Sequence, residues 1–163
     1  MGDTGMAELE RRLSRIEDER AIERMIASYG PLVDAGVAEA TGDLWAVDGS
    51  YDVEGWPMRS RADVVAMVGS DPHQGLITRG CCHFLGPSVV TVTVDGDSAV
   101  AVCESILVRN RDDGFTVARA GANHFRFERI DGRWQIVART TRALDGQAEA
   151  RDLLAAGIRG VAR

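Results

Sequence analysis

Apolar residues recur at every third or fourth position from Glu8 to Val33, which is the spacing of an amphipathic helix. Two successive stripes make up the pattern: Leu9, Leu13 and Ile16, followed by Ile22, Met25, Ile26, Tyr29 and Val33. Pro31 and Gly36 follow near the end of the second stripe. We therefore expect the helix to bend or stop near Gly30.

Three shorter elements are predicted after this helix. The pattern favours a second helix over residues 38–45, a short strand over 49–56 and a third helix over 60–70. Ser60, with Asp63 three positions later, is typical of a capped helix N-terminus.

From His83 onward the pattern changes to the alternation expected of strands. Four runs separated by turns rich in Asp and Gly cover residues 83–94, 98–110, 115–130 and 133–144. These runs predict an antiparallel meander. Gly86-Pro87 predicts a bend in the first run, because proline cannot donate to a central ladder. Residues 148–163 can form a last short helix.

Helices followed by a curved antiparallel sheet indicate an α+β fold. We expect the sheet to curl around the first helices and to leave a pocket between them. A length of 163 residues fits a single domain, 1–163.

The composition of the chain argues against several classes of function and mechanism. The net charge of −6 argues against a nucleic-acid binder. No apolar run approaches the roughly 20 residues that span a bilayer, and the charged N-terminus lacks the apolar core of a signal peptide, so we expect a cytoplasmic protein. All 19 basic residues are arginine, which excludes Schiff-base chemistry on lysine. Three cysteines, two of them adjacent, do not suggest a disulfide framework.

Several polar residues lie on otherwise apolar elements. Asn123 alternates with aromatic residues and is expected to point inward, where it needs a hydrogen-bond partner from the protein, water or a ligand. Asp34 follows the apolar stripe of the first helix and is either a solvated loop residue or a proton-transfer group. Tyr51 is either core or a hydroxyl donor to a substrate oxygen. His124 falls on the wetter face of its strand, where a structural role is expected.

His83 opens a strand in the run "GCCHFLGPSVVTV". The spacing of its neighbours does not match a zinc site, and no second cluster of ligands complements it. Motifs for a nucleophilic serine or a nucleotide cofactor are also missing from the sequence. We therefore expect no metal and no cofactor. His83 is left as either a proton carrier or a satisfied core residue.

Taken together, "ERMIASYGPLVDAGVAEATGDLW", "GSYDVEGW", "HFLGPSVVTV" and "ANHFRFERIDGRWQIVART" resemble the SnoaL-like branch of the nuclear transport factor 2-like superfamily. The resemblance covers roughly residues 8–145 and leaves 146–163 as a helical tail. It implies a cone-shaped α+β barrel, with N-terminal helices packed in the concave face of a strongly curved, mixed and mainly antiparallel sheet. Members include ketosteroid isomerase-like enzymes, polyketide cyclases and small subunits of dioxygenases.

Within that superfamily the candidate site resembles that of scytalone dehydratase, a lyase without a cofactor. The resemblance implies catalytic roles for Asp34, Tyr51, His83 and Asn123. It implies substrate contacts from a second set of residues: Tyr29, Val33, Trp56, Phe84, Asn110 and Phe125. Two positions depart from the pattern, because Val33 stands where the dehydratase has a tyrosine and Asn110 where it has a second histidine.

Three functions remain open from the sequence. The first is a lyase or isomerase that acts by acid–base chemistry on a small apolar carbonyl compound. The second is a protein that binds such a ligand without transforming it, and the third is a structural partner subunit. A homo-oligomer, either a dimer or a trimer, is also expected, with the small residues Ala118, Ala120 and Ala122 on the outer face of the sheet.

Overall fold

The computed structural model describes residues 3–93 and 95–163. Val94, where the first predicted long strand ends, lies outside the described residues. The helices are α1 (Asp3–Asp34), α2 (Ala38–Gly42), α3 (Arg61–Gly69), α4 (Asp71–Arg79) and α5 (Ala148–Ile158). The strands are β1 (Trp45–Val53), β2 (Trp56–Met58), β3 (Cys81–Leu85), β4 (Val89–Val92), β5 (Ser98–Arg111), β6 (Gly114–Ile130) and β7 (Arg133–Ala143).

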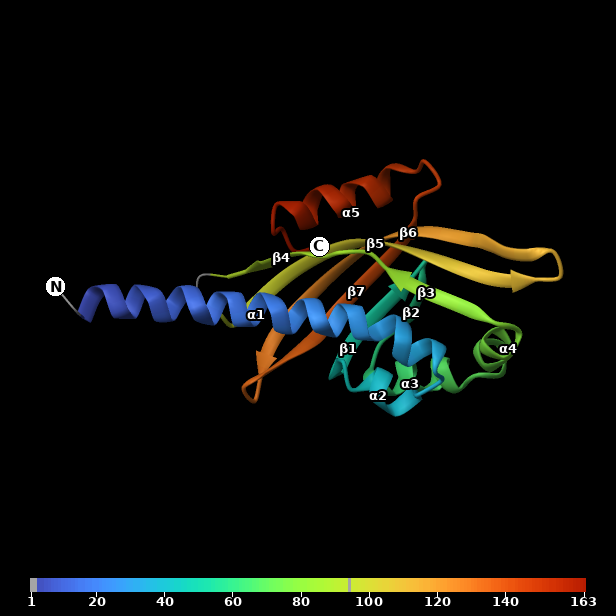
Figure 1. Ribbon diagram of the computed structural model, residues 1–163, viewed down its shortest axis with the longest axis horizontal. Helices are drawn as coiled ribbons and strands as arrows, with labels where there is room; N and C mark the ends of the chain where they lie inside the picture. The colour runs from blue at the N-terminus through green and yellow to red at the C-terminus, as the bar shows by residue number, and fades with distance from the viewer. Residues whose placement is uncertain (1–2, 94) are drawn as a thin grey trace.

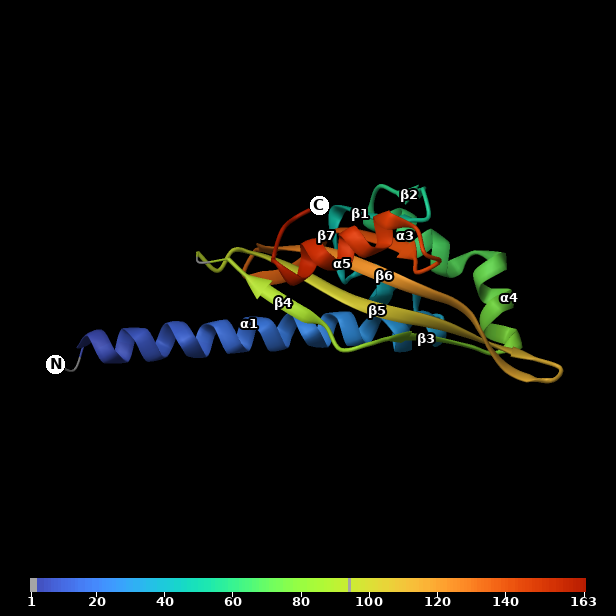
Figure 2. The same cartoon turned by 90° about the horizontal axis from the view of Figure 1, so that it is seen from above.

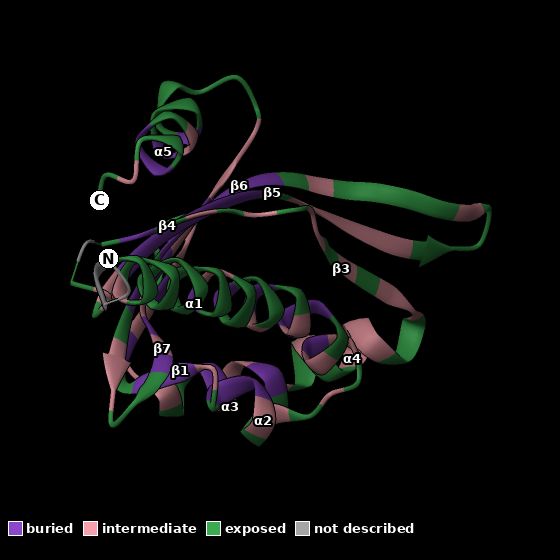
Figure 3. Cartoon of the chain, turned by 60° about the vertical axis from the view of Figure 1, so that its left-hand side comes forward, coloured by how far each residue is buried: buried purple, intermediate pink, exposed green. Residues whose placement is uncertain are grey.

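The described strands form one mixed sheet in the order β2-β1-β7-β6-β5-β3, with β4 also paired to β5. Only the β1–β7 pair among them is parallel. The sheet curls around α1 without closing, and α2 and α3 lie on the same side as α1 (Figures 1 and 3). The predicted α+β class, the mainly antiparallel meander and the helices in the concave face are confirmed.

Helix α1 packs with its second apolar stripe only. Ile22, Ile26, Tyr29 and Val33 are at most 5% exposed, whereas Leu9, Leu13 and Ile16 are more than half exposed. The exposed half of α1 extends beyond the sheet (Figures 1 and 2). Of the two outcomes predicted near Gly30, a bend or a stop, the stop is wrong, because α1 continues through Pro31 to Asp34.

Two predictions for the helices need correction. The helix expected over 38–45 is short, and Trp45 is instead the fully buried first residue of β1. Helix α4 was not predicted, and it has no buried residue. The predicted N-cap is confirmed, since the Ser60 hydroxyl accepts a hydrogen bond from the Asp63 backbone N–H of α3 at 3.2 Å.

Two irregularities in the sheet decide which side chains face α1. The expected bend at Gly86-Pro87 divides the first long run into β3 and β4. In β6, the pairing with β5 shifts between Leu107 and Val108, which leaves Ala118 as an extra residue. Strict alternation predicted that Phe115 and Val117 share a face with Asn123. The bulge moves them to the opposite face, where they are 76% and 63% exposed.

Helix α5 lies across the other face of the sheet from α1 (Figure 3). It covers Val102, whose side chain abuts Gly157. His124, expected on a wetter face, is only 2% exposed, and its Nε2 lies 2.9 Å from the Val161 carbonyl oxygen. Ala118 and Ala120 stay exposed beyond this cover, so self-association through that face remains a prediction. No helix in the described part of the chain is long and apolar enough to cross a membrane.

Candidate functional site

A cavity of about 150 Å³ lies between the C-terminal end of α1, helices α3 and α4 and the concave face of the sheet. Its walls are mostly apolar and include Val53, Met58, Met67, Leu85 and Leu107. The polar side chains that line it come from distant parts of the chain: Tyr29, Tyr51, His73, His83, Ser105, Arg119, Arg139 and Thr141. Such a combination of apolar walls and convergent polar groups is typical of a small-molecule site.

Asp34 and His83 form a short hydrogen-bonded pair at this cavity. The His83 ring Nδ1 lies 2.6 Å from Asp34 Oδ1, and the His83 backbone N–H donates to Asp34 Oδ2 at 2.7 Å. Asp34 ends α1, and His83 lies on β3, which can approach because α1 carries Gly30 there. A Cβ on Gly30 would lie 2.0 Å from the His83 carbonyl oxygen. Both side chains keep about a fifth of their surface exposed, so protons can reach them.

A second imidazole accompanies His83. The His73 ring stacks on the His83 ring with centroids 5.6 Å apart, and its Nε2 lies 3.4 Å from the Val33 carbonyl oxygen. Burial lowers the pKa of His73 from its ordinary value, so the ring is neutral at neutral pH. The sequence pattern suggested that Asn110 replaces the second histidine of the site; in the fold, α4 supplies one at His73.

Cys81 completes a group of three potential metal ligands with Asp34 and His83. Its thiol donates to Asp34 Oδ1 at 3.4 Å, and burial raises its pKa to about 11. A structural zinc site usually has four ligands, and this group supplies three. The donor set fits an acid–base site better than a metal centre.

Two phenols lie beside each other in the cavity wall. The rings of Tyr29 and Tyr51 meet edge to face, with centroids 6.2 Å apart. Burial raises the pKa of Tyr29 well above its ordinary value, so its hydroxyl remains protonated. Thr141 Oγ1 lies 3.4 Å from the Tyr51 hydroxyl. The dehydratase pattern has a tyrosine where this chain has Val33. The same helix supplies Tyr29 instead, one helical turn earlier.

The sequence analysis missed Arg139, which is 3% exposed at the bottom of the cavity. Its guanidinium donates to Asn123 Oδ1 from Nε at 3.3 Å and from Nη2 at 2.8 Å. Strict alternation from Trp134 and Ile136 would turn Arg139 outward. A bulge in β7 at Val137 reverses the alternation and turns it inward instead.

Asn123 is fully buried, as expected, but is not among the residues that line the cavity. Besides Arg139, its Oδ1 accepts a hydrogen bond from Thr141 at 2.8 Å, and its Nδ2 donates to Ser105 Oγ at 2.9 Å. Both ends of the amide are thus occupied by the protein. Asn123 is a positioning residue for Arg139 rather than a contact for a ligand.

Of the other residues predicted to contact a substrate, some lie at the cavity and some do not. Trp56 lines the cavity at its rim and is 59% exposed. Phe125 lies behind the Arg139 guanidinium, and Val33 is buried in the core. Phe84 does not face the cavity. It neighbours His83 on a strand, so it points to the opposite face, where it is 54% exposed.

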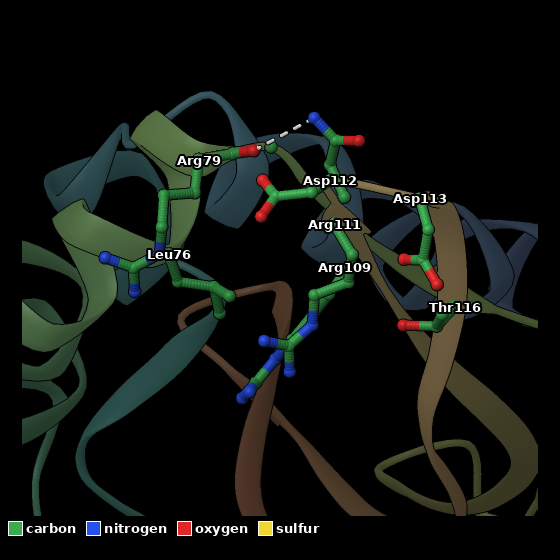
Figure 4. Close-up of a pocket in the computed structure, with 9 residues that line it drawn as sticks. Leu76, Arg79, Arg109, Arg111, Asp112, Asp113 and Thr116 are labelled. Atoms are coloured by element: carbon green, nitrogen blue, oxygen red, sulfur yellow. Dashed lines mark hydrogen bonds between the residues drawn. The ribbon is translucent and has the colours of Figure 1, made fainter.

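Asn110 lies in a different hollow, near the turn of the β5–β6 hairpin and beside α4. Figure 4 shows the side chains that line this hollow, among them Arg79, Arg109 and Asp112. Its Nδ2 donates to the Arg79 carbonyl oxygen at 3.3 Å. This hollow is larger, about 660 Å³, and is lined mainly by charged residues such as Arg109, Arg111 and Asp112. It holds none of the predicted catalytic residues, so we place the candidate site in the smaller cavity.

Comparisons with known proteins agree with this architecture. An NTF2-like protein with a cystatin-like fold from Novosphingobium aromaticivorans is 42% identical, covers 94% of this chain and 98% of its own, and superposes with a TM-score of 0.89. A variant of Rv3472, a protein of unknown function from Mycobacterium tuberculosis, is 21% identical over 86% of this chain and 95% of its own (TM-score 0.69). A Catenulispora acidiphila protein in complex with S-DNPA is 19% identical over 76% and 91% (TM-score 0.63).

The last two similarities show a shared fold and no more, because their identity is low. A comparison with curated proteins finds no match. The SnoaL-like domain matches residues 14–140, which is most of the chain. The fold, the order of its elements and this match lead to one conclusion: the chain belongs to the SnoaL-like domain family.

Proposed function

We propose that this chain is a cofactor-independent lyase or isomerase that acts by acid–base chemistry on a small, largely apolar carbonyl compound. The observation that carries the proposal is the hydrogen bond between Asp34 and His83 at the wall of a mostly apolar cavity. A carboxylate that orients an imidazole beside a substrate pocket is a recurrent arrangement for proton transfer.

His83 is the proposed base. With its Nδ1–H donated to Asp34, the neutral ring has Nε2 available to remove a proton from the carbon next to the substrate carbonyl. Asp34 then stabilises the imidazolium that forms. The same ring returns the proton to another atom of the substrate, which gives isomerisation, or to a leaving hydroxyl, which gives dehydration.

The negative charge that develops on the carbonyl oxygen requires hydrogen-bond donors. Tyr29 and Tyr51 line the cavity, and the raised pKa of Tyr29 keeps its hydroxyl protonated as a donor. Donors that are held in place beside the developing charge commonly supply a large part of catalysis.

The cavity limits the size of the substrate. A volume of about 150 Å³ is close to that of an engineered apolar cavity that binds benzene. A compound with one ring, or with a short branched chain, fits this space.

A ligand-binding protein without turnover is the second candidate. The Catenulispora acidiphila protein with this fold was solved in complex with S-DNPA, which favours a ligand site in such a fold. Turnover distinguishes the two candidates, because binding alone leaves the ligand chemically unchanged.

The test is deuterium incorporation next to the carbonyl of cyclohex-3-enone in D₂O, followed by NMR, together with formation of the conjugated enone. The wild type is expected to accelerate exchange, and His83→Ala and Asp34→Asn should each reduce it by about 10²-fold or more. Cys82→Ser is the matched control, since Cys82 precedes His83 on β3, is exposed and has a thiol that the site does not use. Saturable binding without exchange would favour the binding protein, and equal rates in all variants would overturn the catalytic assignment.

A further inference from the structure

The guanidinium of Arg139 is the most deeply buried cationic group that lines the cavity. Its side chain is 3% exposed, and no carboxylate of the described residues lies within ion-pair distance of it. A buried charge without a partner is unfavourable unless something else compensates it. The structure thus contains a positive charge that the protein itself does not neutralise.

Part of the compensation comes from aromatic rings. The guanidinium carbon lies 4.1 Å from the Tyr29 ring centroid, 4.4 Å from that of Tyr51 and 5.0 Å from that of Phe125. These cation–π contacts hold the group in place while leaving its edge available. Asn123 Oδ1 binds one part of that edge, through Nε and Nη2.

The third nitrogen, Nη1, is buried and has no hydrogen-bond partner in the described structure. Arginine cannot lose its proton to relieve this situation, because its pKa is too high. A buried donor without an acceptor in a native protein calls for an explanation. Since Arg139 lines the cavity, a bound molecule is the natural source of the acceptor.

The other charged groups at the cavity are already matched. Arg119 forms an ion pair with Glu54 through Nη2, although its buried Nε has no partner, and Asp34 is hydrogen-bonded to His83. Arg139 is therefore the cation in this wall whose charge is not paired with a carboxylate of the described residues.

We propose that the ligand of this cavity bears an anionic oxygen on a small planar apolar frame, either a carboxylate or an ionised enol or phenol, and that Arg139 binds this oxygen through Nη1. The proposal rests on the proposed function only in taking the cavity as the ligand site. It adds a recognition group and a substrate class to that site. Tyr29 and Tyr51 pack around the guanidinium, and we expect the planar frame to lie against the apolar wall.

The alternative is that Arg139 is purely structural and that its aromatic contacts are its whole role. The two roles differ in one measurable respect. A structural arginine does not discriminate between an anion and a neutral molecule of the same shape, whereas a recognition group does.

The experiment measures the binding of benzoate and of benzamide, which has nearly the same shape and no charge, by isothermal titration calorimetry. The bound state of 4-nitrophenol is followed by absorbance as the second arm, because its ionised form stands in for an enolate. We compare the wild type with Arg139→Met and Arg139→Lys. Arg142→Met is the matched control, since Arg142 lies on the same strand and forms ion pairs outside the cavity with Asp52 and Glu149.

The wild type and the control are expected to bind benzoate at least about tenfold more tightly than benzamide, and Arg139→Met should remove this preference. Benzoate binding without 4-nitrophenolate binding identifies a carboxylate ligand, and the reverse identifies an enolate or phenolate. Arg139→Lys retains the positive charge but lacks the paired N–H donors of the guanidinium, so it should bind benzoate more weakly than the wild type. It also provides a second test if Arg139→Met does not fold. Equal affinity for benzoate and benzamide, or binding of neither anion by the folded wild type, would overturn the proposal.

The same measurement separates this inference from the catalytic proposal. His83→Ala should keep the wild type's preference for benzoate over benzamide, whatever its effect on the two affinities, because His83 shares the cavity but the discrimination by charge is assigned to Arg139. Loss of exchange activity with this preference intact would leave the inference standing while removing the enzyme assignment.

Discussion

Asp34 holds His83 from two sides, accepting one hydrogen bond from the ring at 2.6 Å and another from the backbone at 2.7 Å. The double contact fixes both the position of β3 and the tautomer of the imidazole. It also bears on metal binding, because ligand atoms about 2.0 Å from a tetrahedral zinc ion lie roughly 3.3 Å apart. Two atoms at 2.6 Å share a proton more readily than a metal.

We therefore predict that metal removal has no effect. Dialysis against EDTA should leave both the exchange rate and the melting temperature unchanged. Elemental analysis of the protein before dialysis should find less than one equivalent of zinc. A stoichiometric metal whose removal abolishes exchange would contradict the acid–base assignment of this group.

Gly30 should be essential for the approach of α1 to β3. Because an added Cβ would lie 2.0 Å from the His83 carbonyl oxygen, Gly30→Ala forces the two elements apart. We expect a loss of about 1–3 kcal/mol in the free energy of unfolding, measured by urea denaturation, and weaker activity. Gly5→Ala is the control in the same helix. Its Cβ would meet nothing within 4 Å, so its stability should be unchanged or higher. A Gly30→Ala protein as stable as the wild type would contradict the packing described.

Arg139→Met should not destabilise the free protein. It removes a buried charge without a carboxylate partner, and Asn123 Oδ1 keeps its hydrogen bond from Thr141. The melting temperature is expected to stay the same or rise, by differential scanning fluorimetry. Arg129→Met provides the contrast, because it removes the guanidinium that donates to the buried Asp18 at 2.7 Å. That change should cost about 1–3 kcal/mol. A larger loss in Arg139→Met than in Arg129→Met would indicate a structural role for Arg139.

Stability should fall as the pH drops below about 6.5. Burial lowers the pKa of both His73 and His124, so the unfolded chain binds protons in a range where the folded chain does not. Protons then favour the unfolded state, and the free energy of unfolding decreases with acidification. His73 faces the Val33 carbonyl, His83 and Asp34, and His124 lies near the Val161 carbonyl, Arg126 and Arg163.

The measurement is the free energy of unfolding from urea titrations between about pH 5 and pH 7.5. The double variant His73→Asn/His124→Asn should show a shallower slope than the wild type over this range. An identical slope in the two proteins would show that other groups cause the dependence.

The spacing of apolar residues was sufficient to predict those helices and strands in which buried and exposed residues alternate regularly. The second stripe of α1 and the alternation in β5 to β7 are visible in the sequence because one face of each element packs against the core. Periodicity could not predict the pairing of Asp34 with His83, since nothing local in either segment indicates that the two meet. The family resemblance implied only that both residues belong to one site.

The errors occur where regular alternation fails. One extra residue at Ala118 turned Phe115 and Val117 outward, and another at Val137 turned Arg139 inward. Bulges leave no simple mark in a single sequence, so the cationic group of the site could not be predicted. Helix α4, which has no buried residue, was also missed, and His73 was missed with it.

Chemical rescue tests the central claim most directly, because it asks whether an imidazole at this position moves the proton. His83→Ala removes the ring and leaves space beside Asp34 for a free imidazole. With cyclohex-3-enone in D₂O, we predict that added imidazole restores deuterium exchange in His83→Ala in a saturable manner, and does so much less in His83→Ala/Asp34→Asn. Exchange by the wild type that persists undiminished in His83→Ala, or a loss that imidazole does not restore at any concentration, would contradict the account.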